Sequence, residues 1–84
     1  MITLIEEPVE MSAVFNRRKV TPVSFVWRGR RYRVTRVTGV HRQRKGQFIE
    51  IYYSVLAGEG ENVYELRFSS ESMNWSLVRI HAGE

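Results

Sequence analysis

Apolar and polar residues alternate with a period of two along most of this chain, which is typical of half-buried β-strands. The alternating stretches are rich in Val, Ile, Thr, Tyr, Phe and Trp, and Gly or polar clusters separate them. The pattern predicts no helix and six strands. These cover Val9–Phe15 with Ile2–Ile5 as an optional extension, Val23–Arg28 opened by Pro22, a third strand ending near Val40, Phe48–Ala57, Val63–Ser69 and Trp75–Ala82.

The hairpin between the second and third predicted strands fixes a register. If Gly29-Arg30 is a two-residue loop of type II′, Trp27 pairs with Tyr32 and Phe25 pairs with Val34. Strand alternation then places these four side chains on the core face and Arg28, Arg31 and Arg33 on the solvent face. A bulge near Thr35–Val37 is predicted, because Arg36 otherwise falls in phase with the core.

Six short antiparallel strands joined by tight turns predict an all-β meander. A twisted sheet of this kind curls into a small barrel of the SH3-like or OB-like size, which removes exposed edges. Residues 1–84 form one domain, since no linker or internal repeat divides them. Pro8 is expected to keep its region at a sheet edge. Trp27 and Trp75 are predicted to be core residues.

The composition narrows the setting of this domain. The absence of cysteine excludes disulfides, thiolate metal sites and cysteine nucleophiles, and it favours a reducing cytoplasm. No apolar stretch is long enough to cross a membrane. The segment Met1–Glu7 lacks the basic leader and apolar run of a secretory signal. The sequence therefore predicts a cytoplasmic protein with no membrane partner.

The net charge of +4 is unevenly distributed. Residues 1–57 hold eleven Lys and Arg against four Glu, whereas residues 58–84 hold two Arg against five Glu. Alternate turns of a meander lie at the same end of the sheet. The first turn should therefore meet the polar connection 41–47, and the second turn should lie at the other end beside Glu59 and Glu61. The first turn and the connection 41–47 together contribute six permanent positive charges: Arg17, Arg18, Lys19, Arg42, Arg44 and Lys45.

Catalysis has little support in the sequence. His41 lies in a basic segment and His81 at the end of the last strand, with no Asp in the chain to orient either ring. Two His and scattered Glu show no metal-ligand spacing. The glycines at 58 and 60 precede no helix that would form a phosphate loop. We therefore expect no enzyme activity and no cofactor.

The segment Pro22–Val34 resembles a small bacterial family of unknown function with the pattern Pro…Phe-x-Trp-x-Gly-x-x-Tyr-x-Val. The later family features correspond to Tyr52-Tyr53-Ser54-Val55, Tyr64-Glu65-Leu66-Arg67 and Trp75-Ser76-Leu77. The chain is also similar to the C-terminal module of inactive Y-family-polymerase-like proteins of damage-induced mutagenesis. It departs from that pattern at Ile51, where an acidic residue is usual, and it has no polymerase domain. The resemblance implies an accessory module associated with DNA repair.

Clustered positive charge on a small β module predicts binding to the phosphates of DNA or RNA. The expected binding residues are Arg17, Arg18, Lys19, Arg28, Arg31, Arg33, Arg42, Arg44 and Lys45, with Tyr52 as a platform for base stacking. The alternative is a protein–protein adaptor that accepts a peptide strand at a sheet edge, or a homodimer formed by edge pairing.

Overall fold

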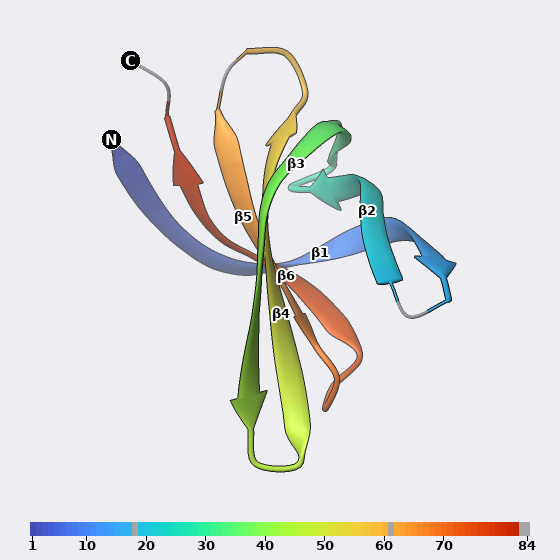
Figure 1. Ribbon diagram of the computed structural model, residues 1–84. Helices are drawn as coiled ribbons and strands as arrows, with labels where there is room; N and C mark the ends of the chain where they lie inside the picture. Colours follow the sequence, from blue (N-terminus) through green and yellow to red (C-terminus); the bar gives the residue numbers. More distant parts are fainter. Residues whose placement is uncertain (18, 61, 83–84) are drawn as a thin grey trace.

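The alternating residues form six β-strands in the computed structural model of the protein, which describes residues 1–17, 19–60 and 62–82 (Figure 1). The strands are β1 (Ile2–Asn16), β2 (Lys19–Trp27), β3 (Arg30–Lys45), β4 (Phe48–Ala57), β5 (Val63–Ser69) and β6 (Asn74–His81). The bounds predicted for β4 and β5 are confirmed, and those of β6 differ by one residue. Within the described ranges no helix has the length and hydropathy needed to cross a membrane.

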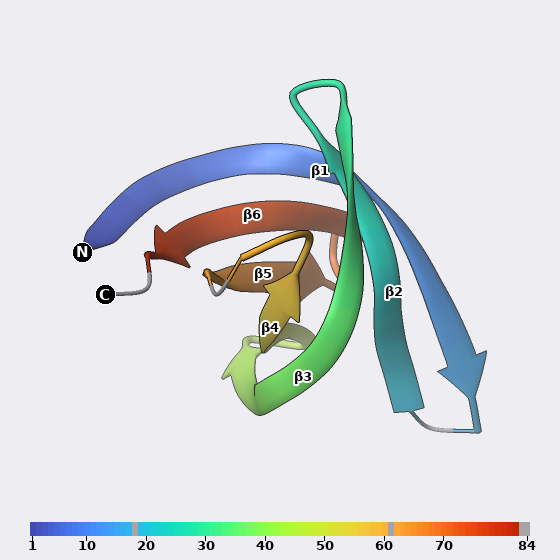
Figure 2. The same ribbon diagram turned by 90° about the horizontal axis from the view of Figure 1, so that it is seen from above.

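Each strand pairs antiparallel with the next, and β1 also pairs with β6, so that the meander closes into a barrel. β1 closes the ring because it pairs with two neighbouring strands along its length. Its first half, Ile2–Val9, pairs with β6, and its second half, Glu10–Asn16, pairs with β2 (Figure 2). Pro8 lies at this change of partner, opposite Ser76 of β6 and outside the ladder with β2. Its missing N–H group therefore interrupts no bond to β2.

The predicted hairpin register is wrong, because the two-residue turn lies one position earlier in the sequence than predicted. The central turn residues are Arg28 and Gly29, with φ angles of 53° and 77°, and Trp27 pairs with Arg30. Positive φ at both positions is the type I′ geometry, whose twist matches that of the flanking strands better than the twist of type I or type II turns does. The opposing residue changes by two, from Tyr32 to Arg30 for Trp27. A shift of two residues leaves every side chain on its predicted face.

Two further corrections concern strand ends. Pro22 does not open β2 but lies within it, opposite Ala13, where a bulge shifts the register. A bulge is one of the few places in a sheet where proline is tolerated. β3 does not end near Val40 but continues to Lys45, because residues 40–45 pair with β4. Polar side chains do not end a strand whose backbone has a partner; the turn comes at Gly46, with φ 65°.

The barrel interior contains two groups of aromatic side chains. Phe25 is fully buried and stacks on Tyr32, with ring centroids 5.2 Å apart, and its edge meets Tyr64. Towards the other end, Trp75 contacts both Tyr53 and Phe68. Leu66, Leu77 and Val55 are fully buried beside them. Trp75 is confirmed as a core residue, whereas Trp27 is only half-buried against the cluster.

Candidate functional site

β3 concentrates the positive charge of the protein. This one strand carries eight basic or titratable nitrogen side chains and no carboxylate: Arg30, Arg31, Arg33, Arg36, His41, Arg42, Arg44 and Lys45. Among the described residues, only Lys45 of this set has a carboxylate within 4.0 Å, namely Glu50. β3 runs from the β2–β3 turn to the opposite end of the barrel (Figure 1). Its uncompensated charges therefore lie along the length of the molecule.

Strand pairing sorts these charges onto two faces. Arg36 lies opposite Leu56, His41 opposite Tyr52 and Lys45 opposite Phe48, all on the outer face of the barrel. The predicted bulge between Val34 and Arg36 is confirmed, and a second lies between Val37 and Gly39. Without such bulges, Arg36 would point into the core. The residues on the outer face, here called the outer track, are Arg31, Arg33, Arg36, His41, Lys45 and the neighbouring Tyr52.

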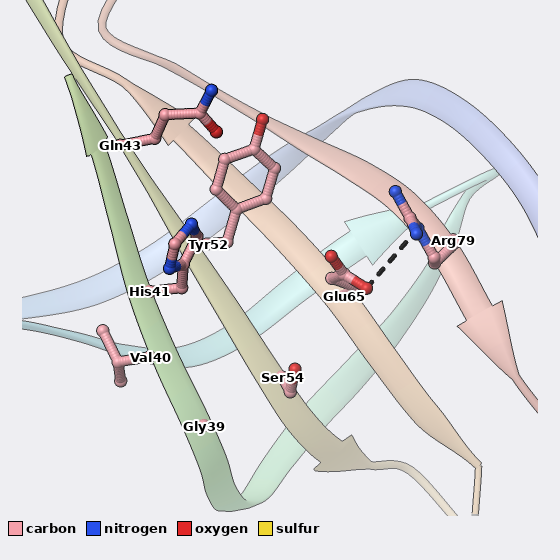
Figure 3. A pocket seen from close by; sticks show the side chains of 8 residues that line it. All are labelled: Gly39, Val40, His41, Gln43, Tyr52, Ser54, Glu65 and Arg79. Carbon is pink, nitrogen blue, oxygen red and sulfur yellow. Dashed lines mark ion pairs between the residues drawn. The ribbon is translucent and has the colours of Figure 1, made fainter.

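A hollow of about 470 Å³ interrupts the outer track at Gly39 (Figure 3). Gly39 has no side chain to fill the space above Ser54. The rings of His41 and Tyr52 lie beside it, with centroids 6.0 Å apart. The phenol of Tyr52 donates a hydrogen bond to Glu50 at 3.1 Å, which fixes the ring. The hollow thus combines an aromatic pair with flanking cations.

The opposite wall of this hollow is electrically balanced. Glu65 of β5 lies 3.4 Å from Nε of Arg79 and 3.5 Å from Nε2 of His81 (Figure 3 shows the first pair). Next to them, Arg67 donates two hydrogen bonds to the carboxylate of Glu6. Because these charges compensate one another, the outer surface changes from cationic on β3 to nearly neutral on β5 and β6.

The two basic turns do not meet as predicted. The β1–β2 turn, with Arg17 and Lys19, and the β3–β4 turn stand apart in both views (Figures 1 and 2). Arg18 lies outside the described residues. Arg42 and Arg44 pair with Ile51 and Ile49, so their side chains leave the face of β3 that is opposite to the outer track. The predicted set is therefore divided between the β1–β2 turn and two faces of β3.

At the other end, the sequence placed the second turn correctly beside the β4–β5 loop. Arg30, Arg31 and Arg33 line one hollow together with Glu59, whereas Glu61 is not described. Sequence reasoning left Arg30 and Arg36 out of the predicted site. Arg30 lies over the ring of Tyr32 at 5.6 Å. The four Arg between positions 30 and 36 were the sequence feature that could have indicated Arg30 and Arg36 as binding residues.

Arg28 is a predicted binding residue whose charge is compensated by a glutamate of β1. Its Nη2 and Nε donate to both oxygens of Glu7, at 2.6 and 3.1 Å, and its guanidinium lies 4.7 Å from the centre of the Trp27 ring. Trp27 Nε1 donates to the same carboxylate at 2.8 Å. Glu7 therefore connects the β2–β3 hairpin to the point where β1 changes partner.

The Glu7 clamp predicts a pH-dependent stability. Hydrogen bonds from Arg28, and secondarily from Trp27, hold the pKa of Glu7 below its ordinary value of 4.5. A lowered folded-state pKa stabilises the fold above the ordinary value, and that stabilisation is lost as the pH falls through the lowered one. Glu7→Gln should be less stable than the wild type in urea unfolding at neutral pH, and this difference should shrink in acid. A difference that stays constant with pH would contradict the clamp.

Neither histidine forms part of a nucleophile arrangement in the described part of the chain. His81 lies 3.5 Å from the carboxylate of Glu65, and the ring of His41 lies beside that of Tyr52. Within the same residues, no three His, Cys, Asp or Glu side chains are grouped to hold a metal ion. The arrangement on β3 instead offers guanidinium and ammonium donors beside aromatic rings, which is suited to anions that carry flat rings.

Comparisons with family models, with curated proteins and with solved structures gave no match. The family resemblance described above therefore stays a prediction, and the geometry of this chain is the basis for its proposed function.

Proposed function

We propose that the protein is a non-catalytic module that binds single-stranded DNA or RNA along the outer track. The observation that supports this most is the series of exposed cations on one face of β3 that flank the His41–Tyr52 pair. Among the described residues, only Lys45 of this series has a carboxylate within 4.0 Å. The cysteine-free composition favours a cytoplasmic site of action. An association with DNA repair would follow from the family resemblance alone.

The phosphate backbone would follow the strand. Residues two apart on one face of a strand lie about 6.6 Å apart, so Arg31 and Arg33 offer closely spaced donors. Arg36 continues the series beyond the bulge. Guanidinium groups bind phosphate oxygens in pairs and stay charged at every physiological pH. Such contacts carry no sequence information, so little sequence preference and a steep dependence on salt are expected.

The aromatic pair favours single strands over duplexes. Bases that are not paired can stack on exposed rings, and each stacked base contributes about 1–3 kcal/mol with little regard to its identity. The hollow at Gly39 gives a base access to the side of Tyr52. A duplex keeps its bases stacked on one another, so it would use only the cations.

The test is fluorescence anisotropy of labelled single-stranded DNA, RNA and duplex DNA, titrated at low and near-physiological salt. Two double variants with the same net charge separate the faces of β3. Arg33→Gln/Arg36→Gln removes charges from the outer track, and Arg42→Gln/Arg44→Gln removes them from the opposite face. The first should weaken single-strand binding and reduce the slope of log K against log salt by about 1.4, at roughly 0.7 for each phosphate contact. The second should change both much less.

Two single variants test the aromatic pair in the same titration. Tyr52→Ala should weaken single-strand binding by about 1–3 kcal/mol and leave duplex binding nearly unchanged. Tyr52→Phe keeps the ring and loses the hydroxyl that bonds to Glu50, so it should bind almost as the wild type does. Flat curves at low salt would refute the proposal. Equal losses in the two double variants would show attraction by net charge and no defined track.

A further inference from the structure

The ladder between β2 and β3 is shorter than the other ladders between described residues of the barrel. It consists of four residue pairs, Ser24–Trp27 with Arg30–Arg33. Beyond these pairs, residues 19–22 of β2 pair with β1 alone, and the paired residues between 34 and 45 of β3 have their partners in β4. Figure 2 shows the two strands leaving their common turn side by side and then separating. Two strand edges therefore face each other without hydrogen bonds between them.

A groove of about 330 Å³ lies between these edges. Residues 19–22 line one side, residues 37–40 line the other, and Tyr53 lies between them. The phenol of Tyr53 donates a 2.6 Å hydrogen bond to the carbonyl of Val20, a residue whose backbone forms no pair with β3. Much of the remaining lining is apolar, from Val20, Pro22, Val37 and Val40. The groove shares Gly39 and Val40 with the hollow of the outer track, and the other residues that line the two are different.

The free edges determine which chemistry fits this groove. An extended peptide supplies alternating N–H and C=O groups that match an unpaired strand edge, whereas a nucleic acid does not. The single ring in the lining, that of Tyr53, is 4% exposed and packs on Trp75, so no base can stack on it. On the β2 side, Pro22 has no N–H and the Val20 carbonyl is occupied. The edge of β3 at residues 34–40 is therefore the better partner for an added strand.

The charges around the groove select an acidic peptide. Lys19 lines it, and neither Lys19 nor Arg17 of the adjoining turn has a carboxylate within 4.0 Å among the described residues. Arg42 leaves β3 on the same face as Val40. Its charge acts on Tyr53 and opposes part of the rise in the pKa of this phenol that burial causes. No described glutamate lines the groove.

We propose that the groove accepts an extended acidic segment of a partner protein, which adds as a strand to the free edge of β3. Apolar side chains of this segment would lie on Val37, Val20 and Tyr53, and its carboxylates would meet Lys19 and Arg42. This is a second interaction surface, and it does not depend on nucleic-acid binding by the outer track.

The experiment titrates the whole protein into a labelled, end-blocked peptide that alternates valine and glutamate over about eight residues, roughly the reach of one strand. Three outcomes are expected. The peptide binds, it slows amide hydrogen exchange in residues 34–40, and Lys19→Glu/Arg42→Glu weakens its binding at least tenfold. The matched variant Arg31→Glu/Arg33→Glu has the same net charge and should bind the peptide much more tightly than the groove variant does.

Control ligands identify the interaction. A valine–lysine peptide should not bind, because the groove is cationic. A peptide methylated on alternate backbone nitrogens should bind at least tenfold more weakly, because it loses donors to the strand edge. Equal binding of the methylated peptide, or no binding of the valine–glutamate peptide, would overturn the proposal. Two other results would assign the groove to another occupant and would also overturn the proposal. One is competition by single-stranded DNA that the groove variant abolishes. The other is a dimer, seen by sedimentation, that the groove variant dissociates.

Discussion

Phe25→Ala is expected to lower the free energy of unfolding by about 3–5 kcal/mol, the range for removing a buried aromatic side chain. Phe25 is 0% exposed and belongs to the buried core of the barrel. Its ring stacks on that of Tyr32 of β3, with an angle of 12° between the planes. It also makes an edge contact with Tyr64 of β5, with ring centroids 5.6 Å apart. The substitution leaves a cavity in this group and removes both ring contacts. Urea unfolding followed by fluorescence measures the loss.

Phe25→Leu is the matched control. It keeps most of the buried apolar surface and loses the ring contacts, so its effect should be clearly smaller than that of alanine. A loss below about 1 kcal/mol for Phe25→Ala would indicate that the site collapses around the smaller side chain or that the group is not part of a tight core. The slope of unfolding against urea should stay unchanged, because neither variant alters the surface exposed on unfolding.

Much of the fold could be predicted from the sequence because the alternation is regular. In β4, every second residue from Ile49 to Ala57 is apolar and faces the core, and a register shift of one residue would turn all of them outward. The bulge after Val34 was predictable for the same reason, since Arg36 and Val37 break the alternation. A break in phase is a local signal, and it needs no knowledge of the rest of the barrel.

The hairpin register and the extent of β3 were not predictable from local pattern. Both Gly29-Arg30 and Arg28-Gly29 give a two-residue turn that keeps Trp27 and Tyr32 on one face. The choice depends on Arg28 adopting a positive φ, and the bonds from Arg28 to Glu7 of β1 hold this residue in place. In β3, residues after Val40 have no alternation of their own. They are extended because β4 pairs with them.

The candidate site was likewise predictable in part, from local sequence, and otherwise depended on strand pairing. The sequence showed that basic residues cluster before residue 46, but their assignment to faces depends on pairing and bulges. The early separation of β2 from β3 removed the predicted meeting of the two basic turns. That separation is a property of how β1 bends from β6 to β2 and closes the ring, and no short segment encodes it. It also leaves a groove beside β3 in addition to the outer track, one surface for each of the proposed partners.

Trp75→Ala should cost the fold about as much as Phe25→Ala, roughly 3–5 kcal/mol, and it should also affect one surface selectively. Trp75 is 8% exposed, and its ring centroid lies 5.4 Å from that of Tyr53 and 5.2 Å from that of Phe68. Tyr53 lies in the β2–β3 groove and reaches the carbonyl of Val20. Removing the indole takes away the packing that positions this phenol, whereas the outer track has no contact with Trp75 among the ring pairs of the structure.

Binding and stability measured together on Trp75→Ala separate these effects. The valine–glutamate peptide should bind more weakly than to the wild type, while binding of single-stranded DNA should stay close to the wild-type value under conditions where the variant is folded. Trp75→Phe retains a ring beside Tyr53, so it should lose less stability and keep most of the peptide affinity. If Trp75→Ala instead weakened both ligands equally, the two faces of β3 would act as one surface, because a change beneath the groove would then reach the outer track as well.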